Sequence, residues 1–257
     1  MRVVATVLML IVLALPLRAQ EEADAVARGN ELYRAGDFAA AAQAYREAIE
    51  QGQDGPRVHY NLGNALYLSE RPGEAIAHYL AAVRMAPRDD DVRANLERAY
   101  AQRSVGPPAP PVSWLHAMLE HLTGRFTLSE LAVAAAVCWW ATVGAAALLI
   151  LGVRRPHRVR RLVWGLGVIT ALLIALALGR WWGYHHQERA VIVAEAGQIC
   201  TGPGESFEVV ESAGEGVVVR VVRRDARWAE VVGESGTHGW ISSDALMSVP
   251  GTVMLER

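Results

Sequence analysis

The sequence predicts a multi-domain membrane protein that combines an all-α solenoid, a two-helix transmembrane hairpin and a small all-β barrel. Three observations predict it. Two uncharged stretches, Leu131–Val153 and Leu162–Gly179, are each close to the length of a bilayer-spanning helix. Residues 23–103 contain an internal repeat, in which the two copies are related by one constant offset. Residues 187–250 contain short Val-, Ile- and Trp-containing runs separated by turn clusters, which is typical of a small β-domain.

A short basic segment separates the two uncharged stretches. A helix needs about 20 apolar residues to cross a bilayer core of ~30 Å, and both stretches are close to that length. The segment between them, 154–161, holds five arginines and no acid. Short arginine-rich loops stay in the cytoplasm, so we expect both flanking regions to lie outside it. The alternative is a buried hairpin in a soluble protein, with both charge-free helices enclosed by the rest of a 257-residue chain.

These observations place eight segments along the chain. In order, we expect a signal peptide (1–19), a repeat domain (20–103), a proline-rich linker (104–112), an amphipathic helix at the membrane interface (113–126), a first transmembrane helix (128–153), a cytoplasmic basic loop (154–161), a second transmembrane helix (162–182) and a β-barrel (187–250).

Charge and cysteine content exclude two classes of protein. Residues 20–103 hold 14 acids and 10 arginines, net −4, and residues 187–257 hold 11 acids and 6 arginines, net −5. Neither region offers the basic face that a nucleic-acid-binding protein requires, so no nucleic-acid partner is expected. The two cysteines, Cys138 and Cys200, are too few for a disulfide framework.

The N-terminus predicts export. Arg2 precedes the apolar run Val3–Leu15, and Ala19 supplies a small residue for cleavage before a polar stretch. An uncleaved anchor is the alternative. In either case the following residues are exported, in agreement with the orientation predicted from the arginine loop.

The two copies in the repeat domain align at a single offset, 34. The aligned pairs are Gly29 with Gly63, Leu32 with Leu66, Tyr33 with Tyr67, Ala41 with Ala75, Tyr45 with Tyr79 and Ala48 with Ala82. Small residues at fixed positions indicate close helix crossings, and we expect the last two tyrosines of these pairs to fill the space between helices. The offset is typical of a helix–turn–helix solenoid.

This region resembles the tetratricopeptide repeat. The second copy, from Tyr60 to Pro87, follows the family pattern closely, whereas the first copy, from Ala23, lacks the closing proline. Asp91–Tyr100 looks like the capping helix that such stacks need.

The resemblance implies a concave face formed by the first helix of each repeat. Carried over by position, this face presents Val26, Asn30, Tyr33, Arg57, Tyr60, Asn64, Tyr67, Asp91 and Arg98. Tyrosines and asparagines in a groove suit an extended peptide; alternatively, they only solvate a helix face. Some family members grip a peptide carboxylate with basic residues, but the matching positions here include Val26, Asp91 and Asn95, so that clamp is absent.

The segment before the first span contains a proline-rich stretch followed by an amphipathic pattern. Four prolines between Pro107 and Pro111 predict a stiff, extended linker. Trp114 then leads an apolar face at helical spacing, which suits a helix lying at the outer membrane interface. Packing under the repeat stack is the alternative. Thr127 and Glu130 form a capping-box pattern that starts the first span.

Small residues within the two spans predict a close approach of the helices. These residues are alanines and Gly144 in the first span, and Gly165 and Gly167 in the second. Neither span contains an ionisable residue that would indicate a proton or ion path.

The C-terminal region resembles the bacterial SH3-like domain. Strands are expected at 190–194, 208–211, 216–222, 228–232 and 239–242. The matching motifs are Thr201–Gly204 in the first loop, Glu215-Gly216 before a central strand, Trp228, and Gly239–Ile241. The cysteine–histidine pairs of hydrolases that carry such domains are not matched.

No catalytic motif, phosphate-binding loop or metal-ligand cluster is found, so the sequence predicts a non-enzymatic protein without cofactor or metal.

The order of segments resembles the BatE family, named for Bacteroides aerotolerance. That resemblance implies a scaffold in the bacterial cytoplasmic membrane, with both soluble domains outside the cytoplasm. Its partners would be membrane proteins with von Willebrand factor A domains and, indirectly, a MoxR-type ATPase, with a role in envelope or stress response. The alternative is a cell-wall sensor or anchor whose barrel binds peptidoglycan.

Overall fold

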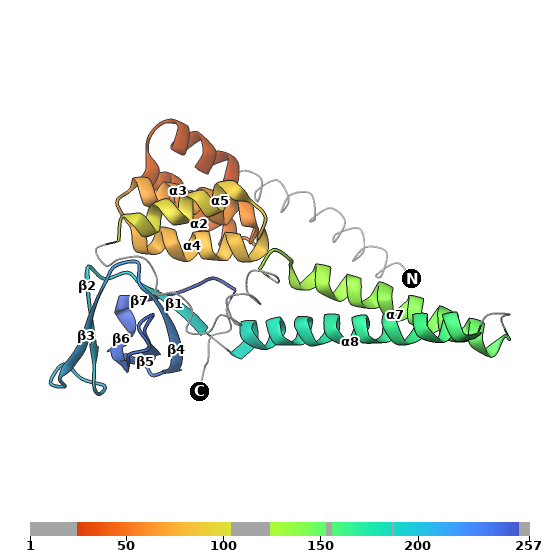
Figure 1. Cartoon of the computed structure of the whole chain (residues 1–257). Helices are drawn as coiled ribbons and strands as arrows, with labels where there is room; N and C mark the ends of the chain where they lie inside the picture. The colour runs from red at the N-terminus through yellow and green to blue at the C-terminus, as the bar shows by residue number, and fades with distance from the viewer. Residues whose placement is uncertain (1–24, 104–123, 153–155, 187, 252–257) are drawn as a thin grey trace, which may run out of the picture. The chain divides into compact units, whose positions relative to one another are not determined.

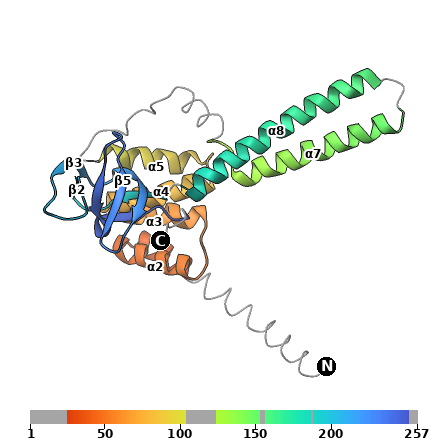
Figure 2. The same cartoon turned by 90° about the horizontal axis from the view of Figure 1, so that it is seen from below.

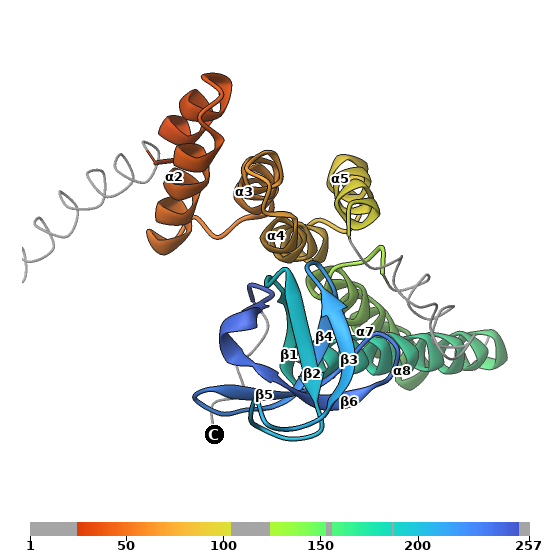
Figure 3. The same ribbon diagram turned by 90° about the vertical axis from the view of Figure 1, so that its left-hand side faces the viewer.

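The repeat region folds as alternating helices in two layers. The computed structural model describes residues 25–103, 124–152, 156–186 and 188–251. Residues 25–34 are helical. They are followed by α2 (Phe38–Glu50), α3 (Pro56–Leu68), α4 (Pro72–Met85) and α5 (Asp90–Ala101). In Figure 3, α3, α4 and α5 are seen nearly end-on, with α4 in a layer of its own beside α3 and α5. The helical part of the predicted fold class is therefore confirmed.

Local sequence signals set the helix ends. Asp37 accepts a hydrogen bond from the backbone N–H of Ala40 and caps α2, and Asp89 caps α5 in the same way through Asp91 and Val92. Pro56 and Pro72 occupy the first turns of α3 and α4, where a missing N–H costs nothing. The start of each of these helices is thus specified by residues at or next to its N-terminus.

A tyrosine lies over a glycine in each repeat. A Cβ added at Gly29 would stand 2.6 Å from Tyr45 Cε1, and one at Gly63 would stand 2.6 Å from Tyr79 Cε1. Both tyrosines are 1% exposed. The positions predicted for close crossing, including Ala41 and Ala75, are fully buried. Each ring therefore fills the space that its glycine leaves.

The two apolar helices pair with each other. They are α7 (Leu128–Ile150) and α8 (Pro156–His186), which lie side by side (Figure 1, Figure 2). Both are long and apolar enough to cross a membrane, over Leu128–Ile150 and His157–Trp181. The predicted capping box at Thr127 and Glu130 is present. Residues 156–161 of the predicted loop belong to α8, because nothing after Pro156 interrupts the helix.

The expected role of the span glycines is wrong. A Cβ at Gly144, Gly165 or Gly167 would meet nothing within 4 Å. The contact instead buries Leu131, Ala135 and Ala145 of α7 and Thr170 of α8. The Thr170 hydroxyl donates a hydrogen bond to Leu166 O of its own helix, with 2.8 Å between the oxygens. Because its donor has a partner, this polar side chain is tolerated in the contact.

The C-terminal region forms one seven-stranded sheet. The strands are β1 (Glu188–Ile192), β2 (Ala196–Cys200), β3 (Val209–Gly214), β4 (Val218–Arg224), β5 (Trp228–Val232), β6 (His238–Ser242) and β7 (Leu246–Ser248), with the 3-10 turn η1 (Ser243–Ala245) before β7. Their order is β3-β2-β6-β5-β4-β1-β7. The all-β domain is confirmed, although β2 and β7 lie outside the expected runs.

The repeat stack and the barrel belong to one compact unit, and the helical hairpin forms another. Arg103, at the end of the stack, has a fully buried side chain. Its guanidinium donates to Gly216 O at 3.1 Å and to Glu234 Oε1 at 3.0 Å, and it lies 4.6 Å from the Tyr100 ring centroid. Glu234 Oε1 also accepts the backbone N–H of Val218 at 3.1 Å, so the pair is anchored in the barrel.

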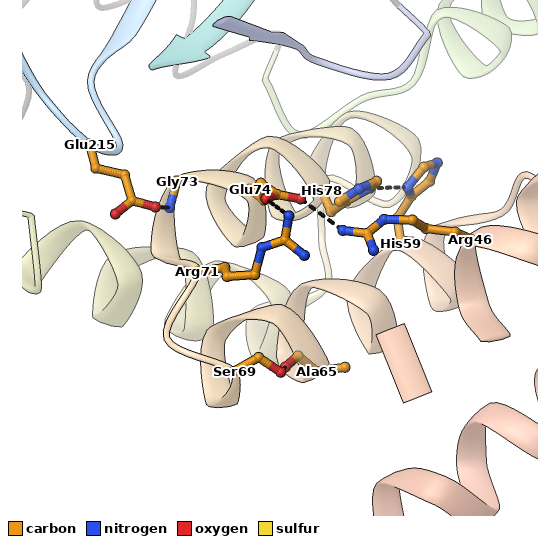
Figure 4. Close-up of polar contacts among 9 residues, drawn as sticks. All are labelled: Arg46, His59, Ala65, Ser69, Arg71, Gly73, Glu74, His78 and Glu215. Carbon is orange, nitrogen blue, oxygen red and sulfur yellow. Dashed lines mark hydrogen bonds and ion pairs between the residues drawn. The ribbon is translucent and has the colours of Figure 1, made fainter. Parts of the chain in front are cut away.

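The barrel also contacts α4. Glu215 Oε1 accepts the N–H of Gly73 at 2.8 Å and so caps the first turn of this helix (Figure 4). At the other end of α4, Arg84 Nη2 donates to Pro250 O at 2.6 Å. Val191 and Val249 of the barrel are buried in the same apolar cluster as the repeat core. The barrel therefore packs along α4, one helix of the second layer.

A buried histidine pair joins α3 to α4. His59 Nδ1 and His78 Nδ1 are 2.9 Å apart (Figure 4), and His59 Nε2 is 2.6 Å from Asp54 Oδ1. Burial lowers the pKa of His78 to about 3, with smaller contributions in the same direction from the neighbouring His59 and Arg46. Burial also lowers the pKa of His59, against the opposing effect of Asp54. Only one proton fits between the two Nδ1 atoms, which agrees with a neutral pair.

The predicted signal peptide, the proline-rich linker and residues 113–123 of the predicted interfacial helix lie outside the described residues.

The tyrosine-over-glycine packing predicts that Gly63→Ala destabilises the protein. In an exposed helix this change stabilises by about 1 kcal/mol, but here the methyl group displaces the Tyr79 ring, at a cost of ~1–3 kcal/mol. The measurement is thermal unfolding of the detergent-solubilised chain. Gly55→Ala is the control, because a Cβ at that N-cap meets nothing within 4 Å. An unchanged melting temperature for Gly63→Ala would contradict the packing.

The histidine pair predicts acid sensitivity. Because the pKa of folded His78 is below that of the unfolded chain, stability is complete above about pH 6.5 and falls as the pH drops from 6.5 toward 3. At pH 5 the loss from this residue is roughly 2 kcal/mol. His78→Gln should show a smaller fall in melting temperature between pH 7.5 and pH 5 than the native chain. His238→Gln, at an exposed position, is the control and should leave the slope unchanged.

Candidate binding groove

The residues predicted to line a groove come from three helices of the first layer. Residues 25–34 carry Val26, Asn30 and Tyr33, α3 carries Arg57, Tyr60, Asn64 and Tyr67, and α5 carries Asp91 and Arg98. Three of them, Asn30, Tyr33 and Asn64, line one hollow of about 270 Å³. Arg34, Tyr45 and Asn61 complete its lining.

The remaining predicted residues lie outside this hollow. Val26 and Tyr67 are half-buried against the repeat core. Arg57 and Asp91 are exposed. Tyr60 is half-buried and packs against Tyr79, with ring centroids 6.3 Å apart.

Asn30 and its two partners form the first polar cluster. Asn30 Oδ1 accepts the Tyr45 hydroxyl at 2.8 Å and Asn61 Nδ2 at 3.3 Å. Tyr45 comes from α2, beneath the groove, and Asn61 comes from α3. One carbonyl oxygen thus joins three helices.

The second polar cluster repeats the first at the offset of the two copies. Asn64 Oδ1 accepts the Tyr79 hydroxyl at 2.7 Å and Asn95 Nδ2 at 2.8 Å. Asn95 Nδ2 also reaches the Tyr60 hydroxyl at 3.1 Å, and Arg98 Nη1 donates to Asn95 Oδ1 at 2.5 Å. The predicted groove residues Tyr60, Asn64 and Arg98 therefore belong to one network.

The buried tyrosines act as donors in both clusters. Burial raises the pKa of Tyr45 and of Tyr79, so both hydroxyls stay protonated at neutral pH. A protonated hydroxyl can donate to the asparagine oxygen above it, which turns the other end of that amide toward the groove. The groove floor is thus built from oriented amides.

Aromatic rings border the polar floor. Tyr33 packs edge-on against Phe38, with centroids 5.3 Å apart, and Tyr60 stands beside Tyr79. Rings with restricted rotamers offer apolar contact area at a low entropic cost. The arrangement can therefore hold a main chain on the amides and side chains against the rings.

Sequence reasoning missed five contributors. Asn61 and Asn95 are related by the same offset as the other repeat pairs, so the repeat itself carried the signal for them. The hydroxyls of Tyr45 and Tyr79 were expected only as space-filling groups. Arg34 has no counterpart at this offset, where Leu68 stands, and only the structure brings it to the hollow.

No cluster of three or more histidine, cysteine or acidic side chains that could hold a metal ion occurs among the described residues. The His59–His78 pair is buried, at 0% and 5% exposure, and so is closed to a ligand.

Two family models match parts of the chain. Residues 26–90 match the tetratricopeptide repeat family, and residues 194–247 match the family described as bacterial SH3 domain. No curated protein matches the chain. Among solved structures, the chain is similar to the "TPR2B-domain:pHsp70-complex of yeast Sti1", with 18% identity and a TM-score of 0.31, over 58% of this chain and 97% of that one.

Proposed function

We propose that this protein is a non-enzymatic, membrane-anchored scaffold whose repeat groove binds an extended segment of a partner protein. The observation that carries the proposal is the repeated amide cluster. Asn30 and Asn64 occupy equivalent positions, each is oriented by a buried tyrosine, and both border the same hollow. Regularly spaced amides suit the regularly spaced polar groups of a peptide main chain.

The docking of the barrel favours the groove as the binding face. The barrel covers α4 through Gly73, Arg84 and the apolar residues around Val249. The hollow is formed mainly by residues 25–34 and α3, with Tyr45 reaching it from α2. Among the described residues, none from the barrel lines the hollow, whereas both ends of α4 contact the barrel.

Contacts between the stack and the barrel also support the proposed topology. These two domains flank the apolar helices in sequence, and their contact favours a topology in which both ends of the hairpin emerge on one side of the membrane. The predicted signal peptide and the predicted retention of the 154–161 arginines in the cytoplasm both support an assignment of that side to the outside of the cytoplasm. We assign the hairpin to a bacterial cytoplasmic membrane on this basis.

The proposed partners follow from the resemblance to the BatE family. They are membrane proteins with von Willebrand factor A domains and, through them, a MoxR-type ATPase, in an envelope complex with a role in stress response or aerotolerance. The tetratricopeptide match over residues 26–90 supports a protein partner in general.

A second candidate function is attachment to peptidoglycan through the barrel. It is supported by the bacterial SH3 match and by an aromatic group on the sheet. Trp240 is half-buried, and the guanidinium of Arg223 lies 5.1 Å from its ring centroid. A tryptophan face with adjacent polar groups can contact a sugar ring or a stem peptide.

The topology predicts the behaviour of reporter fusions. A reporter that is active only outside the cytoplasm should work when fused after Arg103 or Arg257, and it should fail when inserted between residues 154 and 161. Activity within that loop would contradict the orientation.

The groove hypothesis predicts that Tyr60→Ala weakens partner binding. A buried aromatic anchor contributes ~2 kcal/mol or more, so co-purification of A-domain proteins with the full-length chain should fall more than tenfold. Asn64 and Asn95 keep their mutual hydrogen bond in this variant, so helical circular dichroism should barely change. Trp240→Ala is the matched control and should retain the partners. Loss of partners or of sacculus binding only in Trp240→Ala would favour the barrel-centred function.

A further inference from the structure

The barrel carries most of its positive charge in one hairpin, β4–β5. Residues 187–257 hold six arginines, and four of them lie within residues 220–227. These four are Arg220, Arg223, Arg224 and Arg227. The one acid in this stretch of sequence is Asp225, whose Oδ1 accepts the N–H of Ala226 within the turn. By contrast, residues 195–215 hold five acids and no arginine. An otherwise acidic domain therefore contains one basic hairpin.

A β-bulge in β4 exposes two consecutive side chains of this hairpin. The register of β4 with β5 shifts between Val221 and Arg223, so the intervening Val222 has no partner residue on β5. Val221 is 2% exposed, whereas Val222 is 43% exposed and Arg223 is exposed as well. In a regular strand, neighbouring side chains would point to opposite faces. The bulge thus presents an apolar and a cationic group to solvent together.

Two tryptophans lie on the outer face of the sheet beside the hairpin. Every second residue of β5 and β6 is buried, and Trp228 and Trp240 belong to the half-buried set between them. The register places Arg223 opposite Glu230, and Glu230 opposite Trp240. The guanidinium of Arg223 lies 5.1 Å from the Trp240 ring centroid. Tryptophan together with arginine is typical of surfaces at the membrane–water interface.

Three of the four arginines keep their charge available to a ligand. Arg224 is held within the domain, since its Nη2 donates to Ser248 Oγ at 3.1 Å. The other three are exposed and form no ion pair with any acid in the described part of the chain. Glu230 lies opposite Arg223 in the register, but its Oε1 is 3.7 Å from His238 Nδ1. The three guanidinium groups can therefore donate to an anion from outside the domain.

The length of the chain keeps this barrel close to a bilayer. The second apolar span ends at Trp181, and β1 begins at Glu188. The chain between these two residues reaches at most about 25 Å when it is fully extended. Anionic headgroups attract basic residues that lie near the surface, and this attraction falls off within a Debye length. The short connection therefore favours lipid headgroups over a free polyanion as the ligand of the hairpin.

We propose that the β4–β5 hairpin docks on anionic lipid headgroups of the bilayer that anchors the chain. Arg220, Arg223 and Arg227 donate to headgroup phosphates, while Val222 and Trp240 contact the interfacial layer. The inference rests on the membrane anchor of the proposed function and adds a second, charge-dependent attachment through the barrel. Arg223 and Trp240 also belong to the face that supports peptidoglycan binding, so the two ligands are tested against each other.

The full-length chain reconstituted in lipid nanodiscs tests the docking. One set of discs contains phosphatidylcholine alone, and the other contains phosphatidylcholine and phosphatidylglycerol in equal parts. A fluorophore is attached at Val222→Cys in a Cys138→Ala background, and Cys200 stays in place because it is buried. The measurement is protection of the fluorophore from acrylamide, an uncharged quencher in the aqueous phase. A fluorophore at Ser212→Cys, an exposed position on β3, is the control and should stay accessible in both lipids.

Protection at position 222 should occur only in discs with phosphatidylglycerol, and high salt should abolish it because ions screen the attraction. Each arginine near an anionic surface raises the ratio of docked to undocked molecules about fivefold. Arg223→Gln combined with Arg227→Gln should therefore lower this ratio roughly 25-fold. Arg28→Gln combined with Arg93→Gln is the matched control. It removes the same charge from the repeat stack and should keep the native ratio.

Equal protection in the two lipids, protection in neither, or protection that survives in the Arg223 and Arg227 double variant would overturn the headgroup contact. Protection that requires added purified sacculi would overturn it in favour of peptidoglycan binding by the same face. All of these results leave the membrane anchor and the groove standing, because the chain is retained in the disc. Failure of the chain to remain in discs would overturn the membrane anchor of the proposed function, and the headgroup contact with it.

Discussion

The contact of a tyrosine with a glycine, made once in each repeat, links the fold to the groove. The missing side chain at Gly29 and Gly63 lets the rings of Tyr45 and Tyr79 lie between two helices. Each ring is long enough to carry its hydroxyl through the layer to an asparagine on the groove side. Each tyrosine that packs between the helices therefore also orients the amide of the asparagine that it contacts. A change that moves the ring alters packing and groove together.

The docking of barrel and stack depends on local charge pairs, because both domains carry net negative charge. Arg103 and Arg84 supply positive groups from the stack, and backbone oxygens and Glu234 of the barrel receive them. A buried guanidinium is costly unless its charge is paired and its donors are satisfied. Here Glu234 and the oxygen of Gly216 supply partners for the Arg103 guanidinium, and the apolar contacts around Val191 and Val249 bury surface beside them.

Features encoded by neighbouring residues were predictable. The constant offset of the repeats, the small residues at helix crossings and the capping box at Thr127 could be read from the chain because each depends on spacing or on a local turn. Strand β2 was missed, since Ala196–Cys200 includes Gly197 and Gln198 and has weak strand propensity. It forms because it pairs with β3 and β6, and because Gly197 fits against Ile192 and the oxygen of Ala213. The predicted role of Gly144, Gly165 and Gly167 at the helix contact was wrong for a related reason. The sequence shows that these residues are small, but it does not show whether they face the neighbouring helix.

The sequence by itself determined the repeat period, the positions of the apolar spans and the all-β character of the C-terminal domain, because periodicity and hydropathy act along the chain. It also placed Asn30, Tyr33, Tyr60 and Asn64 on the predicted concave face. Only the tertiary structure decided which groups of that face remain open to a ligand. That choice depends on partners from other helices, such as Asn95 and Arg98 for Asn64. It likewise joined Arg103 to Glu234, which are far apart in the sequence, because the repeat stack and the barrel pack against each other through a shared apolar cluster.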